Sequence, residues 1–242
     1  MLKQLTRTTP GRVALGIAAV AVIAVIGAGT AAAIYVFGPG PTGSGHGKTP
    51  TPVPSLTAAA NQVVYTIDGS ATTASFTVDE VLFGAPNTVV GKTNQVTGQV
   101  LVNTQDPALS QIGQIRVDVS TLVTDNDLRN QTMQHRILET SDPANQYAVF
   151  AAKTLTGLPT TTAGHAYGDT FTFQATGDLT LHQVTRTVTF DIQLTVKSAT
   201  LLTGHAQATV RYEDFGMAIP NVPSVSRVSS SVIIALDFTA KA

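Results

Sequence analysis

The sequence predicts a mainly β domain of about eight to ten antiparallel strands with one short inserted helix, preceded by a transmembrane helix. Three observations predict it. From residue 61 onward apolar and polar residues alternate in long runs, Gly, Asn and Asp-Pro turn signals separate these runs, and a long stretch near the N-terminus contains no charged residue. A chain of this kind closes into a barrel or stacks as a sandwich.

Residues 1–12 form a basic N-terminal segment, and residues 13–37 predict a transmembrane helix. The segment 13–37 would span about 37 Å as a helix, enough to cross a hydrocarbon core of about 30 Å. The earlier charges are all positive (Lys3, Arg7 and Arg12), so the positive-inside rule keeps the N-terminus cytoplasmic and places the rest of the chain outside. The expected location is therefore the cell membrane, with a single pass. A signal peptide cleaved near Thr30–Ala33, giving a secreted protein, is the alternative.

Residues 38–60 predict a linker between this span and the domain of residues 61–242. Gly, Ser and Thr dominate the segment, together with Pro39, Pro41, Pro50, Pro52 and Pro54. Such a mixture buries too little apolar surface to fold and stays extended or flexible.

The clearest strand is 188–196, where Val188, Phe190 and Ile192 alternate with threonine and acidic or amide residues. Further strands are expected near 63–67, 75–82, 96–102, 115–119, 147–155, 171–181, 201–210 and 232–238. Residues 125–138 break this pattern, because Leu128, Met133 and Ile137 stand near helical spacing. Asp125 or Asn126 can cap this helix, which would plug or cover a barrel mouth.

The composition narrows the function classes. A net charge of −1 provides no basic surface for nucleic acid, and the absence of cysteine excludes a thiolate metal site or a cysteine nucleophile. The five histidines have no paired metal-ligand spacing, and the chain has no G-x-S-x-G elbow. We therefore expect a protein that is not an enzyme and that holds no metal and no cofactor.

Several stretches resemble the YceI-like domain family, and together they cover residues 61–242. The most specific is Thr176–Val188 (TGDLTLHQVTRTV), which departs from the family pattern at Gln183 and Thr187. The other stretches are Tyr65–Asp68, Ser75–Val78, Asp127–Asn130, Tyr147–Phe150 and Glu213–Met217. In the helix stretch the family's Arg-Asp pair is Arg129-Asn130.

The resemblance implies an extended antiparallel eight-stranded β-barrel of lipocalin-like architecture. Characterised members of the family bind polyisoprenoid lipids, such as isoprenoid quinones or prenyl phosphates, inside the barrel. We therefore expect a membrane-tethered, extracytoplasmic lipid-binding module whose partners are the membrane, through residues 13–37, and an apolar isoprenoid lipid. A homodimer is compatible with this interpretation. The alternative is a non-catalytic accessory or interaction domain of the cell envelope, whose barrel is packed and free of ligand.

The expected ligand contacts lie on the inner face and on the helix. Arg129 could direct its guanidinium at a phosphate or quinone oxygen, although a solvated helix charge is the competing interpretation. His182, at the end of a strand, is expected either to contact ligand or to hold its hairpin by hydrogen bonds. Ala175 is the small residue of an otherwise aromatic row. The remaining candidates are Phe76, Met133, Phe150, Phe171, Phe173 and Phe190.

Overall fold

The computed structural model describes residues 54–242, which form one antiparallel sheet of thirteen strands with a short α-helix. The strands are β1 (Gln62–Ile67), β2 (Thr73–Leu82), β3 (Ala85–Thr93), β4 (Val96–Thr97), β5 (Gln99–Asn103), β6 (Gln111–Ile112), β7 (Gln114–Asp118), β8 (Tyr147–Thr156), β9 (Thr170–Leu181), β10 (Val184–Ser198), β11 (Leu201–Arg211), β12 (Val225–Val228) and β13 (Ser231–Lys241). The helix is α1 (Asp127–Thr132), which continues as a π-helical turn over Met133–Ile137. Single 3-10 turns cover Gly69–Ala71, Pro107–Leu109, Val119–Thr121, Pro143–Asn145 and Tyr212–Phe215.

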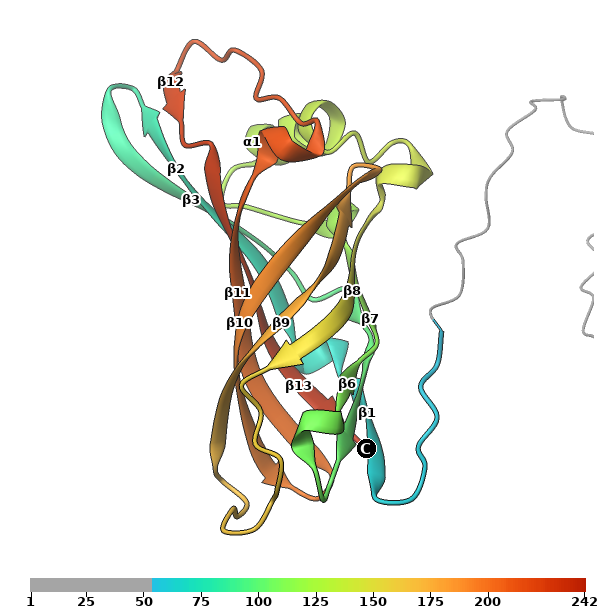
Figure 1. The fold of residues 1–242 in the computed structure, drawn as a ribbon. Helices are drawn as coiled ribbons and strands as arrows, with labels where there is room; N and C mark the ends of the chain where they lie inside the picture. The colour runs from blue at the N-terminus through green and yellow to red at the C-terminus, as the bar shows by residue number, and fades with distance from the viewer. Residues whose placement is uncertain (1–53) are drawn as a thin grey trace, which may run out of the picture. The chain divides into compact units, whose positions relative to one another are not determined.

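The sheet curls around an interior (Figure 1). Its strand order is β4-β7-β8-β9-β10-β11-β13-β1-β5-β6, and β2, β3 and β12 pair beside this path. The strands at the two ends of this order are β4 and β6. Only Gly98 separates β4 from β5, and only Gly113 separates β6 from β7. Because β4 pairs with β7 and β5 pairs with β6, all four strands belong to one hairpin. This shared hairpin brings the ends of the curled sheet together, while β2, β3 and β12 extend at the end where α1 lies (Figure 1).

The prediction of a mainly β, antiparallel domain with one short helix is confirmed. The prediction of eight strands is wrong in its count, because the expected run 96–102 is divided at Gly98 and because β3, β6 and β12 were not expected. β3 contains Pro86, Asn87 and Gly91, residue types that are rare in strands. Its continuous pairing with β2, from Leu82↔Ala85 to Ala74↔Thr93, holds this segment extended in spite of its composition.

The longest hairpin joins β9 and β10 through the two-residue turn His182-Gln183. Both residues have positive φ, +51° and +60°, as a tight turn matched to the twist of the strands requires. On the outer face, directly opposed threonines form hydrogen bonds between hydroxyls, including Thr176–Thr189 and Thr180–Thr185 at 2.8 Å. These hydrogen bonds satisfy the hydroxyl groups on the polar face of the hairpin, whose other face is apolar.

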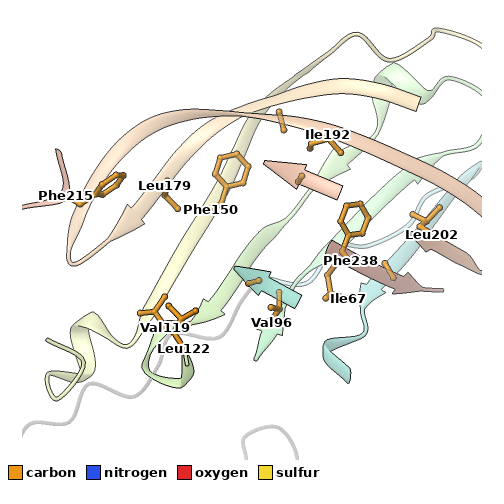
Figure 2. Close-up of a cluster of buried hydrophobic side chains, with 14 of the residues drawn as sticks. Ile67, Val96, Val119, Leu122, Phe150, Leu179, Ile192, Leu202, Phe215 and Phe238 are labelled. Atoms are coloured by element: carbon orange, nitrogen blue, oxygen red, sulfur yellow. The ribbon is translucent and has the colours of Figure 1, made fainter. Parts of the chain in front are cut away.

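The core lies on the concave side of the sheet. Figure 2 shows part of it, with Phe150, Leu179 and Ile192 contributed by the neighbouring strands β8, β9 and β10. Leu202 on β11 and Phe215, in the 3-10 turn after β11, are almost completely buried. Burying one such side chain contributes about 1.5–3 kcal/mol, so this cluster fixes which face of each strand points inward.

The helical prediction for 125–138 is confirmed over most of its length. Asn126 is the cap, since its Oδ1 accepts a hydrogen bond of 3.0 Å from the backbone N–H of Arg129. Met133 and Leu138 are buried against the sheet, while Leu128 is exposed. The inward side of this segment therefore covers one end of the curled sheet.

The basic segment 1–12, the predicted membrane span 13–37 and most of the predicted linker lie outside the described residues. No helix among residues 54–242 combines the length and the apolar character needed to cross a bilayer. Residues 54–59 have no regular structure, and the backbone N–H of Leu56 donates to Oε1 of Gln99 at 2.9 Å. The last residues of the predicted linker thus contact the sheet.

Candidate functional site

A cavity of about 1,090 Å³ occupies the inside of the curled sheet. It exceeds the volume of about 300–1,000 Å³ typical of small-molecule sites. Its wall is predominantly aliphatic and aromatic, with side chains from β1 to β3 and from β5 to β13. The Phe and Tyr residues of the wall are Tyr65, Phe76, Phe83, Phe150, Tyr167, Phe171, Phe173, Phe190, Tyr212 and Phe238.

Strand alternation positions this aromatic wall. Phe171 and Phe173, two residues apart on β9, both face the cavity. Phe150 on β8 and Phe190 on β10 meet across β9 in an edge-to-face pair, with ring centroids 4.8 Å apart. Such edge-to-face pairs stabilise the contact between two rings by about 0.5–1.5 kcal/mol beyond the area that they bury.

Most of the predicted site residues converge on this cavity. Phe76, Arg129, Met133, Phe150, Phe171, Phe173 and Phe190 all line it. Ala175 and His182 do not line it. Ala175 is 0% exposed and lies directly across the ladder from Phe190, on the same face of the sheet.

His182 lies in the β9–β10 turn, outside the cavity. Its Nδ1 is 3.3 Å from the carbonyl oxygen of Phe215, and its Nε2 is 3.4 Å from Oε2 of Glu139. These contacts tie the turn to the 3-10 segment after β11 and to the residue that follows the helix. The hairpin role considered for this histidine is therefore the one that the structure supports.

One end of the cavity carries an ion pair that the sequence did not predict. Nη2 of Arg129 lies 3.1 Å from Oε1 of Glu80, whose side chain is only 8% exposed, and both residues line the cavity. Asn87 Nδ2 donates to the same Oε1 at 2.8 Å, and Nη1 of Arg129 also pairs with Asp125. A signal for Glu80 was present, because it continues the alternation of Phe76 and Val78 on β2.

The opposite end of the cavity carries His165 and Tyr65. Nδ1 of His165 is 3.2 Å from Oδ2 of Asp169, and its ring lies 4.9 Å from that of Phe171. The pKa of Asp169 is lowered, chiefly by the backbone N–H of Ala166 and then by His165. The Tyr65 hydroxyl donates to the carbonyl oxygen of Ala199 at 2.9 Å, and burial raises the pKa of this tyrosine.

Within residues 54–242, the charged side chains of the cavity wall are thus Glu80 and Arg129, which neutralise each other, and His165, which is charged only when protonated. No group of three His, Asp or Glu side chains in this part of the chain is arranged to hold a metal ion. The arrangement can therefore enclose a long apolar molecule and offer it a polar, electrically balanced end.

Comparison with known proteins agrees with this geometry. The chain resembles two solved structures in fold. One is a polyisoprenoid binding domain from Saccharophagus degradans implicated in plant cell wall breakdown, with a TM-score of 0.57 and 19% identity, covering 74% of this chain and 98% of that one. The other is BcnA from Burkholderia cenocepacia, with a TM-score of 0.56 and 16% identity, covering 72% of this chain and 99% of that one.

No curated protein sequence matches the chain. The sequence pattern of the YceI-like domain, however, matches residues 65–240, which include every strand from β2 to β12, the second half of β1 and nearly all of β13. This match spans most of the chain and agrees with the resemblance found in the motifs. The protein therefore belongs to the YceI-like domain family.

Proposed function

We propose that the domain holds a polyisoprenoid lipid inside the curled sheet, as an extracytoplasmic module tethered to the cell membrane by residues 13–37. The observation that carries the proposal is the apolar cavity of about 1,090 Å³. Membership of the YceI-like family supports it, as does the fold shared with a domain described as polyisoprenoid binding.

The energetics favour a long apolar ligand. Each methylene group moved from water into an apolar cavity contributes about 0.8 kcal/mol, so a few isoprene units supply several kcal/mol without any polar contact. The preformed aromatic wall adds to this, because rings such as Phe150 and Phe190 need little rearrangement to receive the chain.

The alternative of a packed envelope domain is less well supported. A closed core requires bulky side chains to fill the interior, as protein cores are packed to the density of organic crystals. The lining instead includes small residues such as Ala148, Ala206 and Ala235 among its aliphatic and aromatic side chains. A cavity of this size would be a destabilising defect if the interior served stability alone.

The head group is better matched by an uncharged isoprenoid, such as a quinone, than by a prenyl phosphate. Arg129 already pairs with the buried carboxylate of Glu80 and with Asp125. A phosphate would have to displace these carboxylates or lie beside the charge of Glu80, which repels it. A quinone oxygen can accept a hydrogen bond at this end without disturbing the pair.

We also infer that the domain binds its ligand without altering it. General acid–base catalysis needs a titrating side chain positioned to exchange a proton with the substrate. Among the ionisable cavity-lining residues of the described part, Glu80 and Arg129 are instead paired with each other, and His165 has Asp169 as its partner.

Lipid extraction and titration test the proposal. The fragment 54–242 contains the whole sheet and cavity, and 74% of this chain is enough to cover 98% of the matched Saccharophagus degradans domain. We expect mass spectrometry of its solvent extract to detect an isoprenoid, and titration with an isoprenoid quinone to saturate. Absence of saturable binding up to tens of micromolar lipid would reject the proposal.

Fractionation tests the proposed location. Full-length protein should sediment with membranes, and protease added outside the cytoplasm should degrade residues 61–242. A soluble form beginning near Ile34 would instead show cleavage and secretion.

Sedimentation velocity of the fragment tests the homodimer, which stays a prediction.

A further inference from the structure

The turn between β2 and β3 contains a phenylalanine whose side chain is not buried in the core. Phe83 has φ of +49° and Gly84 has φ of +82°, in the two-residue turn that follows Leu82 and precedes Ala85. Such turns favour Asn, Asp or Gly at both positions, because a bulky side chain with positive φ is strained. The Phe83 ring is nevertheless 84% exposed, so burial does not compensate for this strain.

Leu128 is a second large apolar side chain exposed at this end. It belongs to the first turn of α1 and is 74% exposed. Helix α1 is joined to β2 by the Arg129–Glu80 ion pair, next to Leu128 on one element and three residues before Phe83 on the other. Phe83 and Leu128 both also line the cavity. The two side chains therefore stand at the rim of the same opening.

The tip of β2 and β3, together with β12 and α1, occupies one end of the domain (Figure 1). Ile219 and Pro220, in the segment before β12, line the cavity at this end as well. An apolar rim that continues into an apolar cavity is the geometry through which a lipid can pass without exposure to water. An apolar rim of this kind is complementary to the hydrocarbon region of a lipid bilayer.

We propose that Phe83 and Leu128 insert into a phospholipid bilayer, so that the cavity mouth rests on the membrane while the lipid enters or leaves. The proposal rests on the proposed lipid-binding function and adds the surface by which the domain meets the membrane.

The charges at the rim specify the kind of membrane surface. Asp125 and Asp127 precede Leu128 on the chain, and the guanidinium of Arg129 is already paired with carboxylates. The exposed arginines of this end, Arg136 and Arg227, stand among the exposed carboxylates of Asp79, Asp125 and Asp127, so the surface carries no net positive charge to attract anionic lipid. Docking should therefore depend on apolar insertion, occur on zwitterionic phosphatidylcholine vesicles, and change little between low and high salt.

Vesicle flotation of the fragment 54–242 tests the docking. Inserting one Phe or Leu side chain corresponds to roughly a tenfold gain in partitioning, so Phe83→Asn and Leu128→Gln should each lower the bound fraction by about that factor. Asn is favoured at positive φ, so Phe83→Asn should leave the melting temperature unchanged or raise it. A purely structural role for Phe83 predicts a lower melting temperature instead.

Leu109→Gln is the matched control. Leu109 is exposed in the turn after β5, whose last residue Asn103 pairs with the first residue of β1, at the end of the sheet away from Phe83. This variant should bind vesicles as the wild type does. Wild-type protein that does not float with phosphatidylcholine, or Phe83→Asn protein that floats equally well, would overturn the proposal.

A fluorescence measurement gives an independent result, because the chain contains no tryptophan. Emission from the Phe83→Trp variant should shift to shorter wavelength when vesicles are added, and emission from Leu109→Trp should not. Sedimentation velocity distinguishes a different occupant: a dimer abolished by Phe83→Asn, without vesicle binding, would assign the rim to a second copy and overturn membrane docking.

Isoprenoid occupancy of the same preparations separates the two proposals. Lipid found in protein that does not float would overturn docking alone. Floating protein that neither carries nor binds an isoprenoid would overturn the lipid-binding function instead.

Discussion

Arg129 and Glu80 form an ion pair at the edge of the cavity, with Nη2 of Arg129 3.1 Å from Oε1 of Glu80. The pair joins α1 to β2, and Asn87 supplies a further hydrogen bond to the carboxylate. Because both side chains line the cavity, the pair fixes the mouth and also sets its charge. An arginine that looked suited to bind a phosphate is thus held by carboxylates of its own protein.

Removing the carboxylate should change which head group the domain prefers. In Glu80→Gln the amide oxygen can still accept from Asn87, while Arg129 loses its buried counter-ion. We expect the affinity for a prenyl phosphate to rise about tenfold, the scale of one charge-assisted hydrogen bond, and the affinity for an uncharged isoprenoid to change less than about twofold. Titration with two lipids of equal chain length measures both values.

Arg129→Gln is the control for this prediction. It should leave prenyl phosphate binding no stronger than in the wild type, and it should destabilise the domain by about 1–3 kcal/mol, because the carboxylate of Glu80 keeps only its amide partner. A stronger preference of the wild type for phosphate than for the neutral lipid would contradict the argument from the pair.

Period-two alternation predicted the strands where one face is buried and the other is solvated. Residues 188–196 show it most clearly and lie inside β10. It failed for β3, where Gly91 is required because a Cβ atom there would collide with the ring of Phe76. The same glycine that weakens the strand pattern makes room for a cavity-lining aromatic side chain, a requirement that arises only from the tertiary structure.

The site was predictable in part for the same reason. Alternation identified the aromatic side chains that face inward, but it does not show which inward-facing side chains border the cavity and which are buried by their neighbours. It therefore could not exclude Ala175, which is fully buried opposite Phe190 and does not line the cavity. Glu80 was missed because charged residues on strands are usually solvent-facing, and only the fold brings it to Arg129, far along the sequence.

His182 should prove structural in its effect. His182→Ala removes the contacts with the Phe215 carbonyl and with Glu139, so we expect a loss of about 1–2 kcal/mol and a melting temperature lower by roughly 2–8 °C. Lipid affinity should not change, since the ring lies outside the cavity. His205→Ala, which removes an exposed pair with Asp237, serves as the control and should shift the melting temperature by much less. A weaker lipid affinity in His182→Ala would restore the ligand-contact interpretation.

Asp68 should contribute to stability in a pH-dependent way. Hydrogen bonds from Lys241, foremost, and from Ser70 lower the pKa of this carboxyl group to about 2. Because the folded pKa lies below the unfolded value near 4, the contribution is complete above about pH 4 and is lost as the pH falls toward 2. Urea unfolding between pH 2 and pH 5 should show the wild type and Asp68→Asn converging in stability at the acidic end. A difference that stays constant over this range would show that the charge of Asp68 is not responsible.

The small residues of the cavity wall allow a direct test of where the lipid lies. Ala206 on β11 lines the cavity between Ile192 and Leu236 on the neighbouring strands. Ala206→Phe should place a ring in the cavity and displace part of the isoprenoid chain. Excluding about two methylene groups costs about 1.6 kcal/mol, or roughly 15-fold in affinity, and the loss should be equal for charged and uncharged head groups.

Ala175→Phe provides the contrast, because Ala175 is fully buried and does not border the cavity. A ring there has no free space, so overpacking should destabilise the domain by about 1–3 kcal/mol, while Ala206→Phe should leave the melting temperature close to that of the wild type. Thermal melts and lipid titrations of the two variants then separate loss of folding from loss of cavity volume. Undiminished lipid affinity in a folded Ala206→Phe protein would mean that the ligand does not occupy the interior of the sheet, because the added ring and the isoprenoid chain cannot share the same volume.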